Sequence, residues 1–400
     1  MHRALACGLI ASLTLLAGVD TPVAAATAVD LKALGPPDRV LFWTPEQQRA
    51  TYPNMDRIFL TREISRGDPK TRPAHPLPRA LQDFSGLTFE AAGKRYNLAE
   101  YLEGNRVAGL LILHKGKIVH EHYGFGHTPA SRWTSFSVAK SLTSMLVGAA
   151  IKDGYIKDVN DLVTTYLPVL KGGSYDGVTI RQVLQMSSGV AWNEDYADPK
   201  SDVARIGAVA AQGGSLGLVT YMGALPRAAA PGTKFNYNTG ETHLVGAIVR
   251  AAIGNNLASY ASRKIWSKFA MESNAFWMLA DEYGAKHAGC CMSATLRDYG
   301  RIGLFALRKG VLADGTAVLP EGWMKDTTTP SSASPEYGYQ WWLAAPGEYG
   351  ARGIFGQSIS IYEPQELIIV THGLWPVATS RELAAVRRAF NDAVRDRLGR

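Results

Sequence analysis

The sequence predicts an α/β (α+β) fold, in which one antiparallel sheet is flanked by helices and joined by an all-helical region. Two observations predict it. Strand-like segments occur early and late in the chain, and the stretch between them shows mostly helical periodicity. The chain has 400 residues, 46% of them hydrophobic, which is enough to bury a sizeable core.

The expected elements follow in chain order. Two strands, 109–115 and 116–123, meet at a glycine-containing turn. A helix follows, because apolar residues recur at helical spacing from Val138 until Gly154 interrupts them. Four more helices are expected at 161–166, 180–186, 241–252 and 257–269, three strands at 339–343, 358–362 and 367–371, and a closing helix at 382–398.

Three segments are predicted along the chain. Residues 1–28 read as a signal peptide, with a positive start, an apolar stretch and small residues at the cleavage site. Residues 29–100 are rich in proline and are expected to form an N-terminal arm packed on the main domain, residues 101–400. We therefore expect a periplasmic or secreted protein with no stable membrane anchor once the signal is cleaved.

Charge and cysteine content limit the partners. The net charge of +7 is mild for this length and the basic residues are scattered, so nucleic acid is not an expected partner. His120 and His122 share one side of a predicted strand without a third ligand, so neither a metal nor a cofactor is predicted. Adjacent Cys290 and Cys291 favour two small buried residues, with a vicinal disulfide as the alternative. The sequence does not indicate an oligomeric state.

The stretch Ser137-Val-Ala-Lys140 carries the chemistry. Residues three apart on a helix share a face, so the hydroxyl and the amine can converge. A serine becomes nucleophilic when a base takes its proton, and a lysine can do so once burial lowers its pKa. Thr134 or Ser135 is expected to cap the helix, which would place Ser137 in the first turn.

Two further segments can complete a site. Tyr237 precedes small polar residues at a turn into a helix, where its phenol can face Lys140; phenolate character would need the ammonium to depress the pKa of the phenol. In 351–357, closely spaced glycines before a strand allow close backbone approach and can supply N–H donors to an oxyanion.

Taken in order, Ser-Val-Ala-Lys, Tyr-Asn-Thr and Ala-Arg-Gly-Ile-Phe-Gly-Gln resemble the class C β-lactamase superfamily, related to penicillin-binding proteins. Within it the chain looks closest to the 6-aminohexanoate-dimer hydrolase and esterase branch. The resemblance runs from about residue 85 to the end, and four other stretches share it: 135–141, 184–189 with 194–196, 289–298 and 339–342.

The resemblance implies a role for each matching residue. Ser137 would be the acyl-accepting nucleophile, Lys140 its base and Tyr237 the proton shuttle to the leaving group. The backbone N–H groups of Ser137 and Ile354 would form the oxyanion hole. The residues implied to contact the substrate are Tyr196, Trp341 and Gly353.

Two departures from the superfamily pattern bear on the substrate. Thr239 stands where the Tyr-x-Asn motif has its amide, and Ala351 stands where Lys-Thr-Gly has its lysine, which helps hold a β-lactam carboxylate. Both changes favour a serine hydrolase acting on a small ester or amide. Carboxylesterase is the first expectation, oligo-amide hydrolase the second, and D-peptidase or β-lactamase the third.

Two rival hypotheses remain at this stage. The protein can be a catalytically silent binding or sensor protein on the same scaffold, although such a role would not require Ser137, Lys140 and Tyr237 together. Residues 213–217 match the G-x-S-x-G nucleophile pattern at Ser215, but the segment before that serine is helix-like rather than a buried strand.

Overall fold

The computed structural model describes residues 29–212, 216–280 and 287–399. The predicted signal peptide (1–28) and Ser215 therefore lie outside the described residues. The chain divides into two units, Met1–Lys32 and Ala33–Arg400, and the description below concerns the second.

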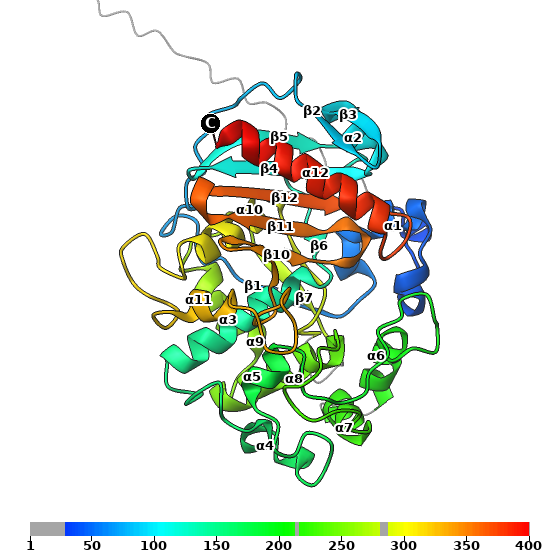
Figure 1. Ribbon diagram of the computed structural model, residues 1–400, viewed down its shortest axis with the longest axis vertical. Helices are drawn as coiled ribbons and strands as arrows, with labels where there is room; N and C mark the ends of the chain where they lie inside the picture. The colour runs from blue at the N-terminus through cyan, green and yellow to red at the C-terminus, as the bar shows by residue number, and fades with distance from the viewer. Residues whose placement is uncertain (1–28, 213–215, 281–286, 400) are drawn as a thin grey trace, which may run out of the picture. The chain divides into compact units, whose positions relative to one another are not determined.

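A six-stranded antiparallel sheet forms the centre of this unit (Figure 1). Its strand order is β5-β4-β12-β11-β10-β9, so the two early strands pair with the late ones through β4 and β12. The strands are β4 Val107–His114, β5 Lys117–Tyr123, β9 Trp342–Ala345, β10 Glu348–Arg352, β11 Ser358–Tyr362 and β12 Leu367–Gly373.

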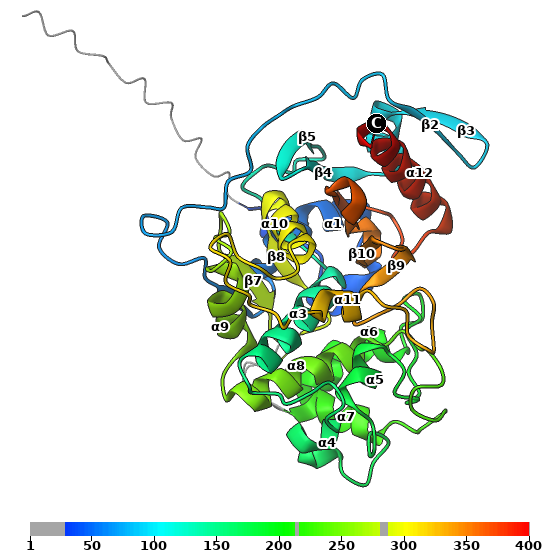
Figure 2. The ribbon, with the colours of Figure 1, turned by 60° about the vertical axis from the view of Figure 1, so that its left-hand side comes forward.

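Helices cover both faces of this sheet, with α10 (Leu296–Leu307) and α12 (Arg381–Leu398) on opposite sides (Figure 2). Alternate residues of β4 enter different cores because side chains alternate along a strand. Leu110 packs in the core that contains α12, whereas Leu111 packs in the core that contains α10. Burial on both faces explains why β4 reads as a nearly unbroken apolar run.

The expectation of a single sheet is wrong. A four-stranded sheet, β1-β7-β8-β6, and a two-stranded one, β2-β3, accompany the central sheet. Their strands have two to four residues, which is too few to show an alternating pattern. Their pairing also joins distant parts of the sequence, since Thr61 pairs with Met278. These strands are β1 Thr61–Ile64, β2 Thr88–Ala91, β3 Lys94–Asn97, β6 Trp133–Thr134, β7 Ala275–Met278 and β8 Met292–Ala294.

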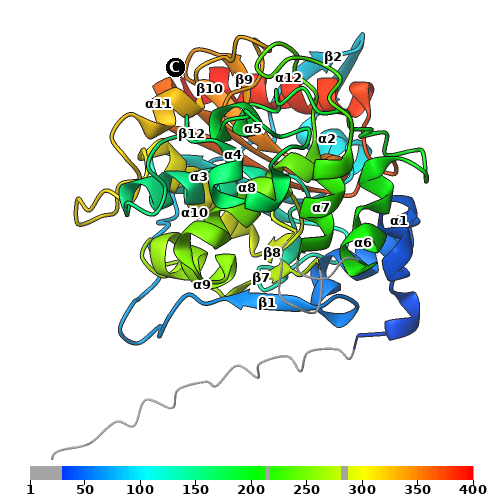
Figure 3. The ribbon, with the colours of Figure 1, turned by 90° about the horizontal axis from the view of Figure 1, so that it is seen from below.

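The predicted helical region is confirmed between α3 and α9 (Figure 3). Helix α8 contains the predicted 241–252, and α9 continues into a π-helical turn at Ser262–Trp266. No described helix is long and apolar enough to cross a membrane. The other helices are α1 Pro45–Thr51, α2 Leu98–Gly104, α3 Val138–Lys152, α4 Val163–Tyr166, α5 Ile180–Leu184, α6 Asp202–Gln212, α7 Gly217–Ala224, α8 Thr239–Ile253, α9 Leu257–Ala261 and α11 Trp323–Thr327.

Two late strands differ from the expectation. β11 coincides with the predicted 358–362, but the strand expected at 339–343 begins only at Trp342. The reason lies at Gln340, whose φ of +63° interrupts an extended chain and whose N–H donates to Leu184 O (3.1 Å). Strand β10 (Glu348–Arg352) was not among the three predicted strands, and it proves to border the candidate site.

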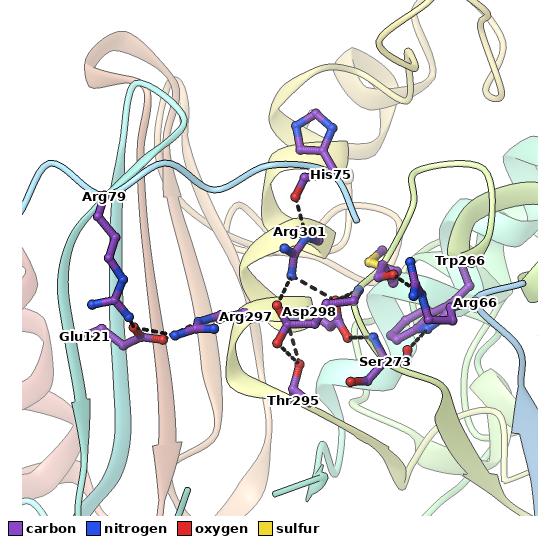
Figure 4. A network of polar contacts seen from close by, with 12 residues as sticks. Arg66, His75, Arg79, Glu121, Trp266, Ser273, Thr295, Arg297, Asp298 and Arg301 are labelled. Atoms are coloured by element: carbon purple, nitrogen blue, oxygen red, sulfur yellow. Dashed lines mark hydrogen bonds and ion pairs between the residues drawn. The ribbon is translucent and has the colours of Figure 1, made fainter. Parts of the chain in front are cut away.

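A buried ionic network fixes the start of α10 (Figure 4). Asp298 accepts hydrogen bonds from the backbone N–H groups of Glu272 (2.7 Å) and Ser273 (3.0 Å), and Arg301 donates to it at 3.1 Å. Burial raises the pKa of Asp298 to about 6, although the Arg301 charge opposes the rise. These bonds connect α10 to the loop that follows α9.

Residues of the proline-rich segment 33–100 contribute to the core beside β6. Tyr52, at the start of the 3₁₀ helix Tyr52–Arg57, is fully buried. Its ring makes edge contacts with Trp133 (5.6 Å between centroids) and Phe136 (5.3 Å), and a tilted contact with Phe355 (6.1 Å). One aromatic side chain of this segment thus touches both loops that border Ser137.

We expect Tyr52→Ala to lower the free energy of unfolding by about 3–5 kcal/mol, because it removes a buried ring from three aromatic contacts. Tyr52→Phe should change it by less than about 1 kcal/mol, since the hydroxyl has no hydrogen-bond partner among the described residues. Urea unfolding of both variants measures this. Equal losses in the two would show that the hydroxyl, and not the ring, holds this contact.

Candidate active site

Ser137 lies immediately before α3 rather than in its first turn. The helix begins at Val138, and the Ser137 side chain makes no capping hydrogen bond. Neither proposed cap serves the helix: Thr134 belongs to β6, and Ser135 Oγ instead donates to Phe136 O (2.8 Å). The Ser137 hydroxyl, on a partly exposed residue, is therefore free of a helix-capping role.

Lys140 converges on Ser137 as the spacing predicts. Its ammonium donates to Ser137 Oγ (3.1 Å), Thr239 Oγ1 (2.9 Å) and Gly289 O (2.7 Å). The side chain is buried, and burial lowers the pKa of Lys140 to about 8, with the negative charge of Glu194 opposing the shift. A substantial fraction of this amine is consequently neutral slightly above neutral pH.

Tyr237 lies next to the lysine, with its ring centroid 5.2 Å from Lys140 Nζ. Burial, reinforced by the charge of Glu194, raises the pKa of Tyr237, and the Ser137 hydroxyl only partly opposes this. The phenol is therefore neutral, and the condition for phenolate character is not met. Trp342, partly exposed, stacks on the Tyr237 ring at 5.4 Å between centroids.

Two backbone N–H groups near Ser137 are left without protein acceptors. The N–H groups of Val138, Gly353 and Phe355 donate to Ser135 O, Gln357 O and Ala378 O. Those of Ser137 and Ile354 have no acceptor within the described part of the chain. Unpaired N–H groups on partly exposed residues can bind a developing oxyanion.

The segment carrying Ile354 is pressed against the segment carrying Ser137. A Cβ added at Gly353 would lie 2.5 Å from Ser135 O and 3.2 Å from Phe136 Cβ. Phe136 and Phe355 both have positive φ (43° and 60°), and their rings pack 5.2 Å apart. Such backbone conformations are costly for these residues and are often found at functional sites.

Of the predicted substrate contacts, Tyr196 lies near the surroundings of Lys140, whereas Trp341 lies in the core. The Tyr196 hydroxyl donates to Glu194 Oε1 (2.8 Å), which links it to the Lys140 surroundings. Trp341 is fully buried and packs against Tyr349, which leaves it no surface for a substrate. Its neighbour Trp342, in contrast, stacks on the ring of Tyr237.

Two residues of the site were missed from the sequence: Trp342 and Glu194. Trp342 follows Trp341 directly, and only the observed strand start distinguishes them. Glu194 lies in a stretch that carries the family resemblance, yet no sequence signal connects it to Thr239, 45 residues later, to which it is hydrogen-bonded.

The preference for two unbonded cysteines is wrong, since the structure joins Cys290 and Cys291 in a vicinal disulfide. The pair is adjacent to the site: the N–H of Cys291 donates to Phe136 O (3.3 Å), and the carbonyl before the pair, Gly289 O, accepts from Lys140. Within the described ranges, no group of three His, Cys, Asp or Glu residues is arranged to hold a metal ion.

Comparison with known proteins agrees with this geometry. A sequence model of the beta-lactamase family matches residues 96–384. The chain belongs to the beta-lactamase family. It is 29% identical over 370 residues to the 6-aminohexanoate-dimer hydrolase of Paenarthrobacter ureafaciens, covering 87% of this chain and 91% of that protein.

Solved structures of this beta-lactamase family fold are also similar to the chain. A "Putative 6-aminohexanoate-dimer hydrolase from Bacillus anthracis" has a TM-score of 0.77 at 24% identity, covering 88% of this chain and 94% of the other. A family VIII carboxylesterase has a TM-score of 0.56 at 15% identity, covering 74% and 95%. The chain is thus a beta-lactamase-family hydrolase related to 6-aminohexanoate-dimer hydrolase.

We expect Gly353→Ala to slow acylation of the protein by p-nitrophenyl acetate by roughly 100-fold, as for the loss of one oxyanion donor. The added methyl meets a backbone carbonyl, Ser135 O, so the edge carrying Ile354 must move away from Ser137. A stopped-flow measurement of the p-nitrophenol burst tests this. Acylation at the wild-type rate by a folded variant would contradict the oxyanion assignment.

Proposed function

We propose that the protein is a serine hydrolase that cleaves a small ester or amide through an acyl-enzyme on Ser137. The observation that carries the proposal is the 3.1 Å contact between Lys140 Nζ and Ser137 Oγ, made by a buried amine whose pKa is lowered to about 8. Base and nucleophile are already within hydrogen-bond distance.

In the acylation step, neutral Lys140 takes the Ser137 proton while Oγ forms a bond to the substrate carbonyl carbon. The carbonyl oxygen becomes an oxyanion that the N–H groups of Ser137 and Ile354 can bind. The bond to the leaving group then breaks. The departing alkoxide or amine takes a proton from the Tyr237 phenol, which is replaced from the Lys140 ammonium.

Deacylation runs the same proton path in reverse. A water gives one proton toward Lys140 as its oxygen attacks the acyl carbon, and the second tetrahedral intermediate uses the same two N–H groups. Collapse breaks the bond to Ser137 Oγ, which recovers its proton from the lysine and releases the carboxylic acid. No metal or cofactor takes part in these steps.

The substrate class follows from what surrounds the nucleophile. Ala351, where the superfamily has a lysine, is buried in the core and offers no cation to a β-lactam carboxylate. The names of a sequence relative and a structural neighbour, 6-aminohexanoate-dimer hydrolase and carboxylesterase, support an amide or an ester. We therefore expect turnover of short esters or aminohexanoate oligomers and little turnover of nitrocefin.

A fluorophosphonate probe should label the wild type on Ser137 and should not label Ser137→Ala, because the phosphonyl group needs that oxygen. Lys140→Arg should slow labelling by roughly 100-fold or more, since a guanidinium does not lose its proton. Ser144→Ala is a matched control: Ser144 is buried in the same helix with no hydrogen-bond partner among the described residues.

Labelling is read by intact-mass spectrometry, with thermal melting to establish folding. A folded wild type that resists both the probe and p-nitrophenyl acetate would contradict the hydrolase proposal and favour the silent binding protein. Loss of labelling in Ser144→Ala would instead attribute the effect to damage to α3.

We further propose that the protein is exported. The composition of residues 1–28 supports it, and so does the bond between Cys290 and Cys291, since disulfides persist in oxidising compartments. Cell fractionation and N-terminal sequencing should find the protein in the periplasm or medium, beginning near residue 27 or 29. Recovery of the intact chain from the cytoplasm alone would contradict export.

A further inference from the structure

Glu194 is a carboxylate that lies behind the candidate base Lys140, separated from it by Thr239. Its Oε2 accepts hydrogen bonds from Thr239 N (2.9 Å) and from Trp192 Nε1, and its Oε1 accepts from Tyr196 OH (2.8 Å) and from Thr239 Oγ1. All four donors are neutral. No described Lys or Arg forms an ion pair with this carboxylate, so its charge is not neutralised by a direct partner.

The hydrogen bonds of Thr239 have only one consistent arrangement. A hydroxyl carries a single proton, and Thr239 Oγ1 gives its proton to the Glu194 carboxylate, which can only accept. Toward Lys140 Nζ, 2.9 Å away, the same oxygen can therefore only accept. The carboxylate fixes the direction of the hydrogen bond between Thr239 and the lysine.

The two hydrogens of the neutral Lys140 amine determine where its lone pair points. The neutral amine has two N–H groups and one lone pair, and it faces three partners. Gly289 O (2.7 Å) can only accept, and Thr239 Oγ1 can only accept, so both N–H groups are used there. The lone pair is left for the third partner, Ser137 Oγ at 3.1 Å, which is the group whose proton must be taken.

We propose that Glu194 is a positioning residue for the hydrolytic reaction: by fixing the proton of Thr239, it directs the lone pair of neutral Lys140 at Ser137 Oγ. This inference rests on the proposed roles of Ser137 and Lys140. It gives Thr239, where the superfamily motif has an asparagine, a defined function as a relay between the carboxylate and the base.

The charge of Glu194 has a second effect that provides a readout. It raises the pKa of Lys140 against the larger lowering by burial. Acylation needs the neutral amine, so its rate rises with pH through the pKa of Lys140, with a midpoint of about 8 in the wild type. Removing the negative charge should favour the neutral amine and shift this midpoint to lower pH.

The experiment compares Glu194→Gln with Glu121→Gln. Glu121 is a matched control: it also accepts from a tyrosine two residues later, Tyr123 (2.7 Å), but it lies in β5 and pairs with Arg79 and Arg297 (Figure 4). The burst of p-nitrophenol from p-nitrophenyl acetate is followed from pH 5 to 10, with melting temperatures for each variant.

For Glu194→Gln we expect the midpoint at lower pH and a plateau rate lower by roughly 10–100-fold, because the lone pair is no longer directed. For Glu121→Gln we expect the wild-type midpoint and plateau, with a lower melting temperature. A wild-type plateau rate in folded Glu194→Gln would overturn this inference while leaving acylation of Ser137, and hence the proposed function, intact. A wild type that is not acylated would overturn the proposed function itself.

A second pair of variants tests the relay if Glu194→Gln does not fold. Thr239→Ser keeps the hydroxyl and should retain most of the plateau rate, whereas Thr239→Val removes it and should lower the rate by roughly 10–100-fold. Equal rates in folded Thr239→Ser and Thr239→Val would overturn the inference, because the hydroxyl would then play no part in directing Lys140.

Discussion

The burial of the Lys140 amine is the constraint on which the rest of the site depends. A buried ammonium is costly unless its hydrogens are bonded, and here three neutral oxygens surround it. A carboxylate in direct contact would stabilise the charged form and raise the pKa of the lysine. Glu194 instead lies one hydrogen bond further away, behind Thr239. The pKa of the amine is thereby held at about 8, close to neutral pH, so the amine can both take and return a proton.

This arrangement explains why α3 occupies the middle of the fold. The oxygens that accept from the Lys140 amine come from three parts of the chain: Ser137 before α3, Thr239 at the start of α8 and Gly289 in the segment before β8. The helix is buried from Val138 to Ala150, between the central sheet and the helical region. A helix surrounded in this way is covered by protein on all sides, so the amine of Lys140 is bonded to oxygens that its neighbours supply.

Local patterns were enough to predict much of this structure. The spacing of Ser137 and Lys140 identified the pair because residues three apart meet on a helix, and the strand-like segment 358–362 predicted β11. Features that depend on distant partners were not predictable. The sheet containing β1 and β7 joins residues about 200 positions apart, and Glu194 reaches Thr239 only through tertiary folding. With two adjacent tryptophans, Trp341 and Trp342, the alternation alone could not decide which faces Tyr237, because a one-residue shift exchanges the faces of a strand.

Alternation along a strand also determines where β10 places its positive charge. At the position where the superfamily has a lysine, Ala351 faces the core, whereas the next residue, Arg352, is exposed with its guanidinium 5.3 Å from the Trp342 ring centroid. A cation facing the Lys140 side would lower the pKa of that amine further and favour carboxylated substrates. Its absence leaves burial and Glu194 to determine the basicity of Lys140. This environment supports the proposal of uncharged esters and amides as substrates, while the guanidinium of Arg352 lies beside Trp342, which in turn stacks on Tyr237.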